Sequence, residues 1–459
     1  MTVYLNALFL LLLQLISPST VAQEAARMAI AEEVRNSIEN EMINRWYPNA
    51  YDHENGGYVS SFEYDFSPSE NQNKMIVSQA RHLWTLSKLM ERYPDTSHYA
   101  AGAKLGLDFL INKFWDQEHG GFFTLLDRKG NVLENNQGAK TAYGNAFGIY
   151  GLAAYHHASG DPSALEWAKK AFYWLEKNSY DPEFGGYFQS LERDGTPSKR
   201  NEQTPSTATT GYKDQNSSIH LLEAFTELYQ VWKDPLLKRR TEELLVIIRD
   251  TIVQNEGYLQ LFLLADWTPV SFRDQGRSAI EKHHNIDHVS YGHDVETAYL
   301  MMEASHVLGL TNDYKTWEIG KKMVDHALMH GWDGQSGGFY DGGYYFPEED
   351  APEIVKDTKN WWAQAEGLNT LLIMADLYPD DPMEYFAKFK QQWNYIQQNL
   401  IDHAYGGWYS GGLDKQPELK NGQKGHIWKT AYHNFRSLHN CDLKLRDPSH
   451  LALTIKSKE

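Results

Sequence analysis

A short motif that recurs along the chain constrains the fold more than any other feature of the sequence. Each copy is an aspartate followed, after three residues, by two glycines and an aromatic residue. Neighbouring intact copies are 64, 65 and 69 residues apart, and a degraded copy (Asn255-Glu256-Gly257-Tyr258) lies about halfway across the one long gap. Regular spacing of this kind is typical of repeat architectures, so the sequence predicts six units. The intact copies begin at Asp52, Asp116, Asp181, Asp333 and Asp402.

Each unit combines a turn, a short strand-like piece and helical segments. Two adjacent glycines can both adopt positive φ, which suits a tight turn, and an aromatic run such as residues 120–126 follows. A unit of about 65–75 residues has room for two helices of ordinary length and their loops. Apolar residues recur at i, i+3 and i+4 over residues 80–90, 146–158, 218–232, 295–306 and 363–377.

Six helical hairpins in sequence must cover one another. One hairpin cannot bury its apolar face alone, so each unit needs a neighbour on both sides. We therefore predict an all-α fold, an (α/α)6 barrel or six-hairpin toroid with short β-hairpin-like Gly-Gly-aromatic turns. We expect residues 23–459 to form one domain of this kind. An open solenoid is the alternative, but neither end of the chain shows a polar capping unit.

The first 22 residues are predicted to be a signal peptide. Residues 7–16 are apolar, Ser17-Pro18-Ser19 interrupts them, and Thr20-Val21-Ala22 offers a cleavage site before Gln23. The apolar run is too short to span a bilayer, so we expect cleavage rather than anchoring. The protein is therefore expected to be exported, periplasmic or secreted, with no membrane span after cleavage. A buried amino-terminal helix is the alternative.

Charge and composition narrow the class of partner. The chain has 43 Lys and Arg against 61 Asp and Glu, a net charge of −18, which disfavours nucleic acid as a partner. Aromatic residues make up 13% of the chain, and flat rings beside polar groups suit the faces of sugars. The single cysteine, Cys441, excludes an intrachain disulfide. We expect a sugar or oligosaccharide as substrate and a monomer or homodimer.

Three histidines stand in contexts that favour chemistry. His293 and Glu296 are three residues apart at the start of a predicted helix, so they can share a face, where the carboxylate could orient the imidazole. His433 follows the last repeat turn, and His220 lies one helical turn after Asn216. For any one histidine, a structural or surface role is the plainer interpretation.

No metal or cofactor is predicted. His283, His284, His288 and His293 are close in sequence, but their spacing matches no standard zinc motif and no cysteine assists. The sequence has no Gly-rich phosphate loop before a helix and no Gly-x-Ser-x-Gly nucleophile elbow.

Six motifs follow one another along nearly the whole chain and resemble a known family. They are Arg81-His82-Leu83-Trp84-Thr85, Ala142-Tyr143 with Ala146 to Leu152, Asn216 with His220 to Ala224, Tyr291 to Glu296, Trp361 to Glu366, and Trp428 with Tyr432-His433-Asn434. The set resembles the N-acylglucosamine 2-epimerase family, and within it the cellobiose (or mannobiose) 2-epimerase branch. The family's fold is the same (α/α)6 barrel.

The resemblance implies an isomerase that inverts C2 of a sugar. It implies two catalytic histidines, His293 and His433, that remove and return a proton on opposite faces of C2 through an enediolate, without metal or redox cofactor. It further implies that Arg81 stabilises the enediolate charge, that Glu296 orients His293, and that His220 acts in ring opening or contacts a sugar hydroxyl. The expected reaction interconverts glucose and mannose at the reducing end of a β-1,4-linked disaccharide.

The same resemblance implies a set of sugar-binding residues. Trp428, five residues before His433, is expected to be the platform for a second sugar ring. The expected lining residues are Tyr143, Asn216, Trp361, Glu366 and Trp428.

Four other functions remain open on the sequence alone. An aldose–ketose isomerase of the mannose isomerase type would use the same enediolate, and an N-acylglucosamine 2-epimerase would use the same chemistry on another sugar. A six-hairpin glycoside hydrolase would need a pair of carboxylates instead. A non-catalytic carbohydrate-binding toroid would leave C2 unchanged.

Overall fold

The computed structural model describes residues 18–199 and 212–449. Residues 1–17 of the predicted signal peptide lie outside the described residues. From Pro18 the chain forms helix α2 (Pro18–Asn36), which continues past the predicted cleavage site before Gln23. None of the helices in the described part of the chain is long and apolar enough to cross a membrane.

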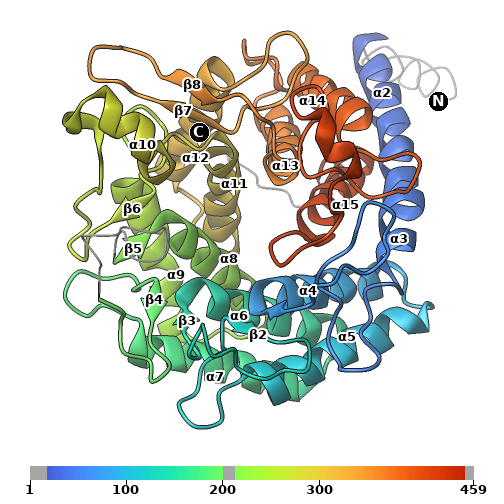
Figure 1. Ribbon diagram of the computed structural model, residues 1–459. Coiled ribbons are helices and arrows are strands. Elements are labelled where there is room, and N and C mark those ends of the chain that lie inside the picture. Colours follow the sequence, from blue (N-terminus) through green and yellow to red (C-terminus); the bar gives the residue numbers. More distant parts are fainter. Residues whose placement is uncertain (1–17, 200–211, 450–459) are drawn as a thin grey trace, which may run out of the picture.

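Six inner helices form a closed ring (Figure 1). Each packs against the next inner helix, and the last one returns to the first. Their residues are buried around most of the helix circumference, as expected of helices enclosed on all sides. Every segment with predicted helical periodicity lies in one of them. The inner helices are α4 (Ile76–Arg92), α6 (Ala142–Ser159), α8 (Gln215–Val231), α11 (Tyr291–Val307), α13 (Trp361–Leu377) and α15 (Tyr432–Arg446).

Six outer helices surround this ring, each against one inner helix. Helix α2 packs on α15, so the amino-terminal helix completes the last unit. The predicted all-α (α/α)6 barrel is confirmed. The other outer helices are α5 (Ser97–Phe109), α7 (Pro162–Asn178), α9 (Pro235–Ile247), α12 (Tyr314–His330) and α14 (Tyr385–Asn399). Shorter helices lie between these elements: η1 (Ser37–Ile43), α3 (Asn44–Trp46), η2 (Leu110–Phe114), η3 (Ile248–Ile252), η4 (Arg273–Gln275), α10 (Arg277–Asp287) and η5 (Pro417–Asn421).

A small antiparallel hairpin surrounds each of the repeat turns. In the second unit Trp115 pairs with Phe122 across the turn, and both Gly120 and Gly121 have positive φ. A Cβ on Gly121 would lie 2.6 Å from the Trp174 ring, so the turn requires glycine there for space as well as for conformation. The degraded copy forms the same hairpin through Val253 and Leu259. The predicted hairpin-like turns and the sixth unit are therefore confirmed.

Short strands connect consecutive units at the same end of the barrel. The strand after a turn pairs with the strand that precedes the previous inner helix. The pairs are β1 (Lys74–Met75) with β2 (Leu125–Leu126), β3 (Lys140–Thr141) with β4 (Ser190–Leu191), and β5 (Lys213–Asp214) with β6 (Phe262–Leu263). The pair β7 (Gly342–Tyr344) and β8 (Glu353–Lys356) instead forms a hairpin within one unit.

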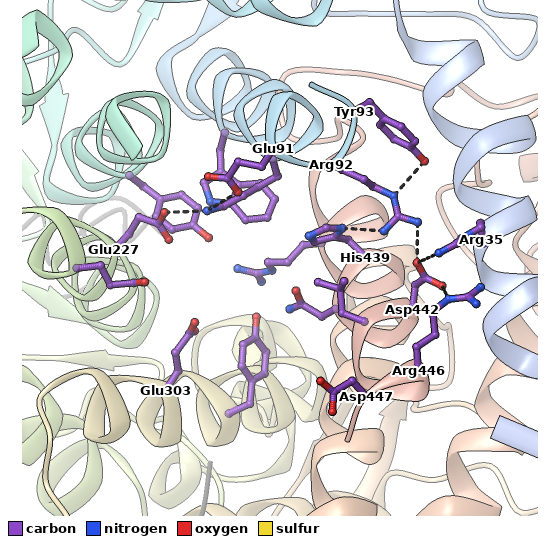
Figure 2. Close-up of a pocket in the computed structure, with 18 of the residues that line it drawn as sticks. Arg35, Glu91, Arg92, Tyr93, Glu227, Glu303, His439, Asp442, Arg446 and Asp447 are labelled. Atoms are coloured by element: carbon purple, nitrogen blue, oxygen red, sulfur yellow. Dashed lines mark hydrogen bonds and ion pairs between the residues drawn. The ribbon is translucent and has the colours of Figure 1, made fainter. Parts of the chain in front are cut away.

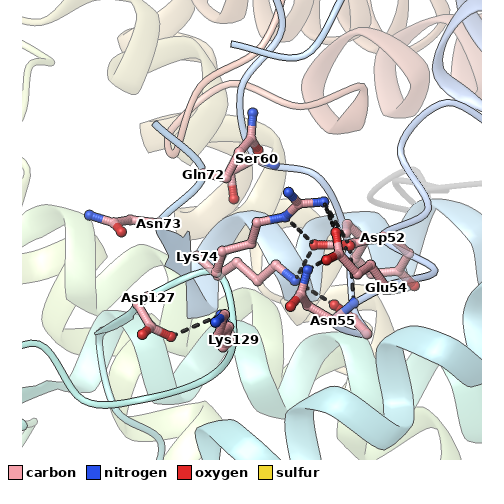
Figure 3. A network of polar contacts seen from close by, with 12 residues as sticks. Asp52, Glu54, Asn55, Ser60, Gln72, Asn73, Lys74, Asp127 and Lys129 are labelled. Carbon is pink, nitrogen blue, oxygen red and sulfur yellow. Dashed lines mark hydrogen bonds and ion pairs between the residues drawn. The ribbon is translucent and has the colours of Figure 1, made fainter. Parts of the chain in front are cut away.

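A buried lysine fastens each intact turn. Figure 3 shows the first case, where Lys74 Nζ donates to Asp52 Oδ2 at 3.0 Å, and it also bonds the Gly56 carbonyl. We call this lysine–aspartate pair a clamp. In the fourth unit Gln254 and Val289 occupy the two positions, so the clamp is lost as a pair. The other clamps are Lys140–Asp116 (2.9 Å), Lys213–Asp181 (2.7 Å), Lys359–Asp333 (2.8 Å) and Lys424–Asp402 (2.5 Å).

The fourth residue of several inner helices bonds the turn of its own unit. Gln79, Asn145 and Gln364 each accept from the backbone N–H of the turn's aromatic residue and donate to its carbonyl. In α11 the fourth residue is Asp294, whose Oδ1 accepts from Leu259 N–H at 3.0 Å. Its Oδ2 is buried and has no hydrogen-bond partner in the described part of the chain, and burial raises the pKa of Asp294 well above its ordinary value.

Candidate active site

The barrel contains a cavity at each end of its inner helices. The front cavity, about 720 Å³, lies at their N-terminal ends. The rear cavity, about 740 Å³, lies at their C-terminal ends, and Figure 2 shows that ion pairs such as Arg92–Asp442 (2.6 Å) form part of its wall. Four of the predicted site residues, Tyr143, Asn216, His293 and Trp428, line the front cavity. Its lining includes Tyr143, Asn216, Ser290, His293, Trp362 and Trp428.

His293 reaches the front cavity from the first turn of α11. Its Nδ1 lies 2.7 Å from Ser290 Oγ, and its ring is centred 4.5 Å from the ring of Trp362. Burial, with smaller contributions from His220 and Lys356, lowers the pKa of His293 to about 3. The imidazole is therefore neutral at neutral pH and available as a base.

His433 approaches the same tryptophan from the start of α15. Its ring is centred 6.2 Å from Trp362, and its Nδ1 lies 2.6 Å from Glu366 Oε1. Burial, Arg81 and Arg436 hold the pKa of His433 well below its ordinary value. A carboxylate at Nδ1 fixes the ring and stabilises it when Nε2 takes up a proton.

His220 lies behind the lining, against Tyr143 and Phe147. Their rings are centred 5.2 and 4.9 Å from its own. Its Nδ1 lies 2.7 Å from Glu223 Oε2, and burial lowers its pKa. His220 is close enough to His293 and His433 for its charge to lower the pKa of both. The three histidines therefore belong to one site.

Arg81 connects two walls of this site. Its guanidinium donates to the Tyr143 hydroxyl and to the Trp428 carbonyl, both at 3.1 Å, and lies over the Phe147 and Tyr432 rings. Its Nε is buried and has no partner among the described residues. A buried cation with an unused donor beside the cavity can stabilise a developing oxyanion.

The comparisons with known proteins agree with this geometry. Residues 56–437 match the model of a family described as N-acylglucosamine 2-epimerase (GlcNAc 2-epimerase). The chain belongs to this family. It is therefore a carbohydrate epimerase, an isomerase, and the hydrolase and the non-catalytic toroid are set aside.

The relatives and solved structures of this epimerase extend over most of its length. A cellobiose 2-epimerase of Bacteroides fragilis is 28% identical over 414 residues, 89% of this chain and 97% of the relative. One of Dictyoglomus turgidum is 27% identical over 414 residues, covering 89% and 96%. The structure of cellobiose 2-epimerase from Bacillus thermoamylovorans matches with a TM-score of 0.77 at 25% identity, covering 91% and 99%.

Beneath the histidines of the epimerase, three carboxylates surround one guanidinium. Arg436 pairs with Glu296 at 2.7 Å and with Glu366 at 2.8 Å, and it also bonds Glu223. Arg436 lines the rear cavity, so this cluster separates the two cavities. Donor atoms of Glu296, Glu366 and His433 lie within 4.8 Å of one another, a possible metal-ligand group among the described residues, but Arg436 already supplies the cation there.

Two predicted carboxylate roles are corrected by these contacts. Glu296 was expected to orient His293, yet its carboxylate accepts from Arg436, and it is Ser290 that contacts the His293 ring. Glu366 was expected to line the sugar site, but it is fully buried and holds His433. The helix places position 296 one turn below position 293, where it faces the barrel interior rather than the cavity.

Trp361 is corrected in the same way. It is 8% exposed and packs on the segment before α15, with its ring centred 5.7 Å from His426. Its neighbour Trp362 lines the cavity instead. The position within the helix could have indicated Trp362 rather than Trp361. Tyr143, Asn216, Trp362 and His433 are each the second residue of an inner helix.

The remaining predicted lining residues lie at the front cavity, while several contributors were not predicted. Tyr143 and Asn216 line the wall, and Trp428, 46% exposed, stands at its edge with its ring centred 6.4 Å from that of Tyr143. Five contributors to the site were given no role from the sequence: Ser290, Glu223, Trp362, Tyr432 and Arg436. Trp362, Tyr432 and Arg436 act through contacts between distant units, which no local motif encodes. Ser290 and Glu223 each stand three residues from the histidine they contact, and that spacing was a usable signal.

Proposed function

We propose that the enzyme inverts C2 of the reducing-end hexose of a β-1,4-linked disaccharide of the cellobiose type. The observation that carries the proposal is the pair of neutral imidazoles that contact one tryptophan ring at the front cavity. In each, Nδ1 is engaged by Ser290 or Glu366, which leaves Nε2 for the substrate. Two bases are what an inversion needs, because the proton leaves one face of C2 and returns on the other.

The proposed reaction begins from the open-chain aldose. One histidine Nε2 takes the C2 proton, the C–H electron pair forms a C1–C2 double bond, and the carbonyl oxygen at C1 becomes an oxyanion. The other histidine takes up a proton from solvent at Nε2 beside the enediolate and gives it to C2 from the opposite face. The C1–C2 electron pair forms the new C–H bond, the carbonyl re-forms, and the first histidine releases its proton to solvent. The Arg81 cation and the N-terminal ends of the inner helices both favour negative charge here. We assign His220, held by Glu223, to opening the sugar ring.

The edge of the cavity supports a disaccharide as substrate. The largely exposed Trp428 ring offers a flat apolar surface above the wall formed by Tyr143. Such a surface suits the face of a second sugar ring. The single-ring alternatives, mannose isomerisation and N-acylglucosamine epimerisation, make no use of it.

Proton NMR in heavy water tests this function. We expect cellobiose to give the mannose-configured disaccharide with deuterium at C2. A ketose product would show that the enediolate is protonated at C1, which replaces epimerisation by isomerisation. Faster turnover of N-acetylglucosamine or mannose than of any disaccharide would contradict the proposed substrate class.

A further inference from the structure

A lobe that the other units lack lies beside the front cavity. It consists of α10 and the β7–β8 hairpin, which lie together in Figure 1. Ile280 of α10 packs with Tyr344 and Phe346 of the hairpin, and Arg277 pairs with Glu353 at 3.1 Å. Among the described units, the one with β7 and β8 is alone in pairing its two strands with each other, so the lobe is a departure from the repeat.

The lobe brings Lys356, His288 and Asn285 to the wall of the front cavity. Lys356 is the last residue of β8 and passes beside Gly342 of β7. A Cβ on Gly342 would lie 2.7 Å from the His288 ring and 3.4 Å from Lys356 Cδ. The glycine therefore makes room for both side chains, which indicates a position built to hold them.

Lys356 carries a positive charge that no described residue pairs. The five clamp lysines are buried and paired with aspartates, whereas the half-buried Lys356 ammonium has no hydrogen bond or ion pair within the described ranges 18–199 and 212–449. The nearby acid Asp341 is already bonded by Thr358 Oγ1 at 2.5 Å and Asn360 N–H at 2.8 Å. A half-buried charge without a partner is costly unless a ligand supplies one.

The neighbours of Lys356 in the cavity wall limit the ligand's charge. The Asp341 carboxyl lies near enough to raise the pKa of Lys356 against the effect of burial, and Asn285 is an amide that can donate. Burial lowers the pKa of His288 to about 3, and its neutral ring donates Nδ1–H to the His284 carbonyl at 3.1 Å, which leaves Nε2 as an acceptor. The subsite therefore offers at most one positive charge, with one amide donor and one imidazole acceptor beside it. One charge matches a carboxylate better than a doubly charged phosphate ester.

We propose that Lys356, assisted by the Asn285 amide, binds a carboxylate on the sugar ring beyond the reacting one, while His288 Nε2 accepts from a hydroxyl of that ring. The preferred substrate is then an acidic disaccharide, a β-1,4-linked hexuronosyl hexose. This rests on the proposed function, since it places the reacting ring at His293 and His433. It adds the substrate's charge, which the cellobiose-type assignment leaves open.

Binding and turnover of a matched pair of sugars test the subsite. Calorimetry at low salt would compare cellobiose with β-1,4-glucuronosyl-glucose, on the wild type, Lys356→Met and Lys356→Arg. We expect the wild type to bind the acidic sugar about tenfold more tightly, the advantage to disappear in Lys356→Met, and Lys356→Arg to restore part of it. Lys238→Met, which removes a positive charge from outer helix α9, is the control and should keep the preference.

The outcomes separate this inference from the proposed function. Equal binding of the two sugars by the wild type, or a preference that survives in Lys356→Met, would overturn the carboxylate subsite. Tighter binding of the 6′-phosphate of cellobiose than of the uronate would overturn the choice of carboxylate. Failure of the wild type to exchange C2 hydrogen in either sugar would instead overturn the proposed function, and the binding comparison would still decide the subsite. Thermal melts check that each variant folds.

Discussion

Three carboxylates share the charge of Arg436, and this sharing sets the protonation of the site. Arg436 and His220 hold the pKa of Glu223 at about 2 against the effect of burial, so Glu223 is ionised. Burial and the neighbouring Glu366 raise the pKa of Glu296 to about 8. Burial raises the pKa of Glu366 as well, while the Arg436 guanidinium at 2.8 Å and the Tyr299 hydroxyl at 3.0 Å favour its ionised form. We therefore assign the proton of this pair to Glu296 and the carboxylate that supports His433 to Glu366.

Replacement of Glu366 by glutamine should be far more harmful than loss of the hydroxyl beside His293. Glu366→Gln removes the negative charge that stabilises protonated His433, so we expect kcat to fall about 100-fold. Ser290→Ala removes a neutral partner, and we expect a loss of about tenfold or less. Steady-state kinetics measure both, with thermal melts as the control for folding. Equal losses would contradict the assigned asymmetry between the two bases.

The pH profile should reflect the low pKa values of the histidines. Burial lowers the pKa of both His293 and His433, so each stays deprotonated below pH 6.5, where an exposed histidine would begin to charge. We therefore expect kcat/KM to keep its value down to pH 5.5 or below. An acidic limb centred near 6.5 or above, measured in inert buffers at constant ionic strength, would show that the free enzyme's base is an ordinary solvated histidine.

Local motifs identified which residues gather at the site but not what each one touches. The positions of His293, His433, His220 and Arg81 follow from the starts of helices, which the repeat locates. Glu366 was misassigned because its partner His433 is 67 residues away, on the next inner helix. Such contacts depend on how two helices are rotated against each other, which the pattern within one helix does not determine.

At the scale of the element, we expect each clamp to contribute to the free energy of unfolding. Lys213→Met leaves the Asp181 carboxylate buried without its cation, so we expect a loss of about 3–5 kcal/mol in unfolding free energy. Lys213→Val combined with Asp181→Gln copies Val289 and Gln254 of the fourth unit and should cost less than the single change. Urea unfolding measures both. Lys238→Met, which breaks the exposed pair with Glu242, should cost less than about 1 kcal/mol.

Asp294 is the acid among the inner-helix side chains that bind a turn, and its replacement by an amide should stabilise the protein. Because burial raises the folded-state pKa of Asp294 above its ordinary 3.8, the protonated form favours folding, and this advantage is lost as pH rises through the folded pKa. Asp294→Asn copies Asn145 and can donate to the turn carbonyl. We expect its stability gain over the wild type to widen by about 1.4 kcal/mol per pH unit above pH 4, until Asp294 ionises.

The reverse change provides the matched control for Asp294. Asn145→Asp should introduce the same penalty in the second unit and destabilise the protein increasingly as pH rises. Urea unfolding at pH 4, 5.5 and 7 follows both variants. A gap between Asp294→Asn and the wild type that does not change with pH would mean that Asp294 titrates normally in the fold.

The sequence predicted the elements better than the contacts that fasten them. Spacing of the Gly-Gly turns located six hairpins and the inner helices, because both depend on local periodicity. The clamp lysines were missed, since they stand 22 to 32 residues after their aspartates in the intact units. A search for a lysine two residues before each inner helix would have found Lys74, Lys140, Lys213 and Lys359.

At the scale of the whole molecule, the contacts of the amino-terminal helix determine how removal of the signal peptide affects stability. Beyond the predicted cleavage site, α2 packs on α15, and Arg27 bonds Asp376 at 2.8 Å and the Lys444 carbonyl at 2.9 Å. We propose that export removes residues 1–22 and leaves these contacts in place. Protein recovered from a secreting bacterial host should begin at Gln23 by mass spectrometry and melt at the temperature of the full-length chain. Recovery of the uncleaved chain from the cytoplasm alone would contradict export.

The loss of the clamp in the fourth unit falls where the lobe is inserted. Val289 stands between α10 and the helix that carries His293, so the unit that departs most from the repeat adjoins the front cavity. All twelve long helices of the described barrel lie outside residues 264–289 and 342–358, so they can stay unchanged while these two segments are rebuilt. Exchanging the two segments between members of the family offers a route to retarget the catalyst while Ser290, His293 and His433 stay in place.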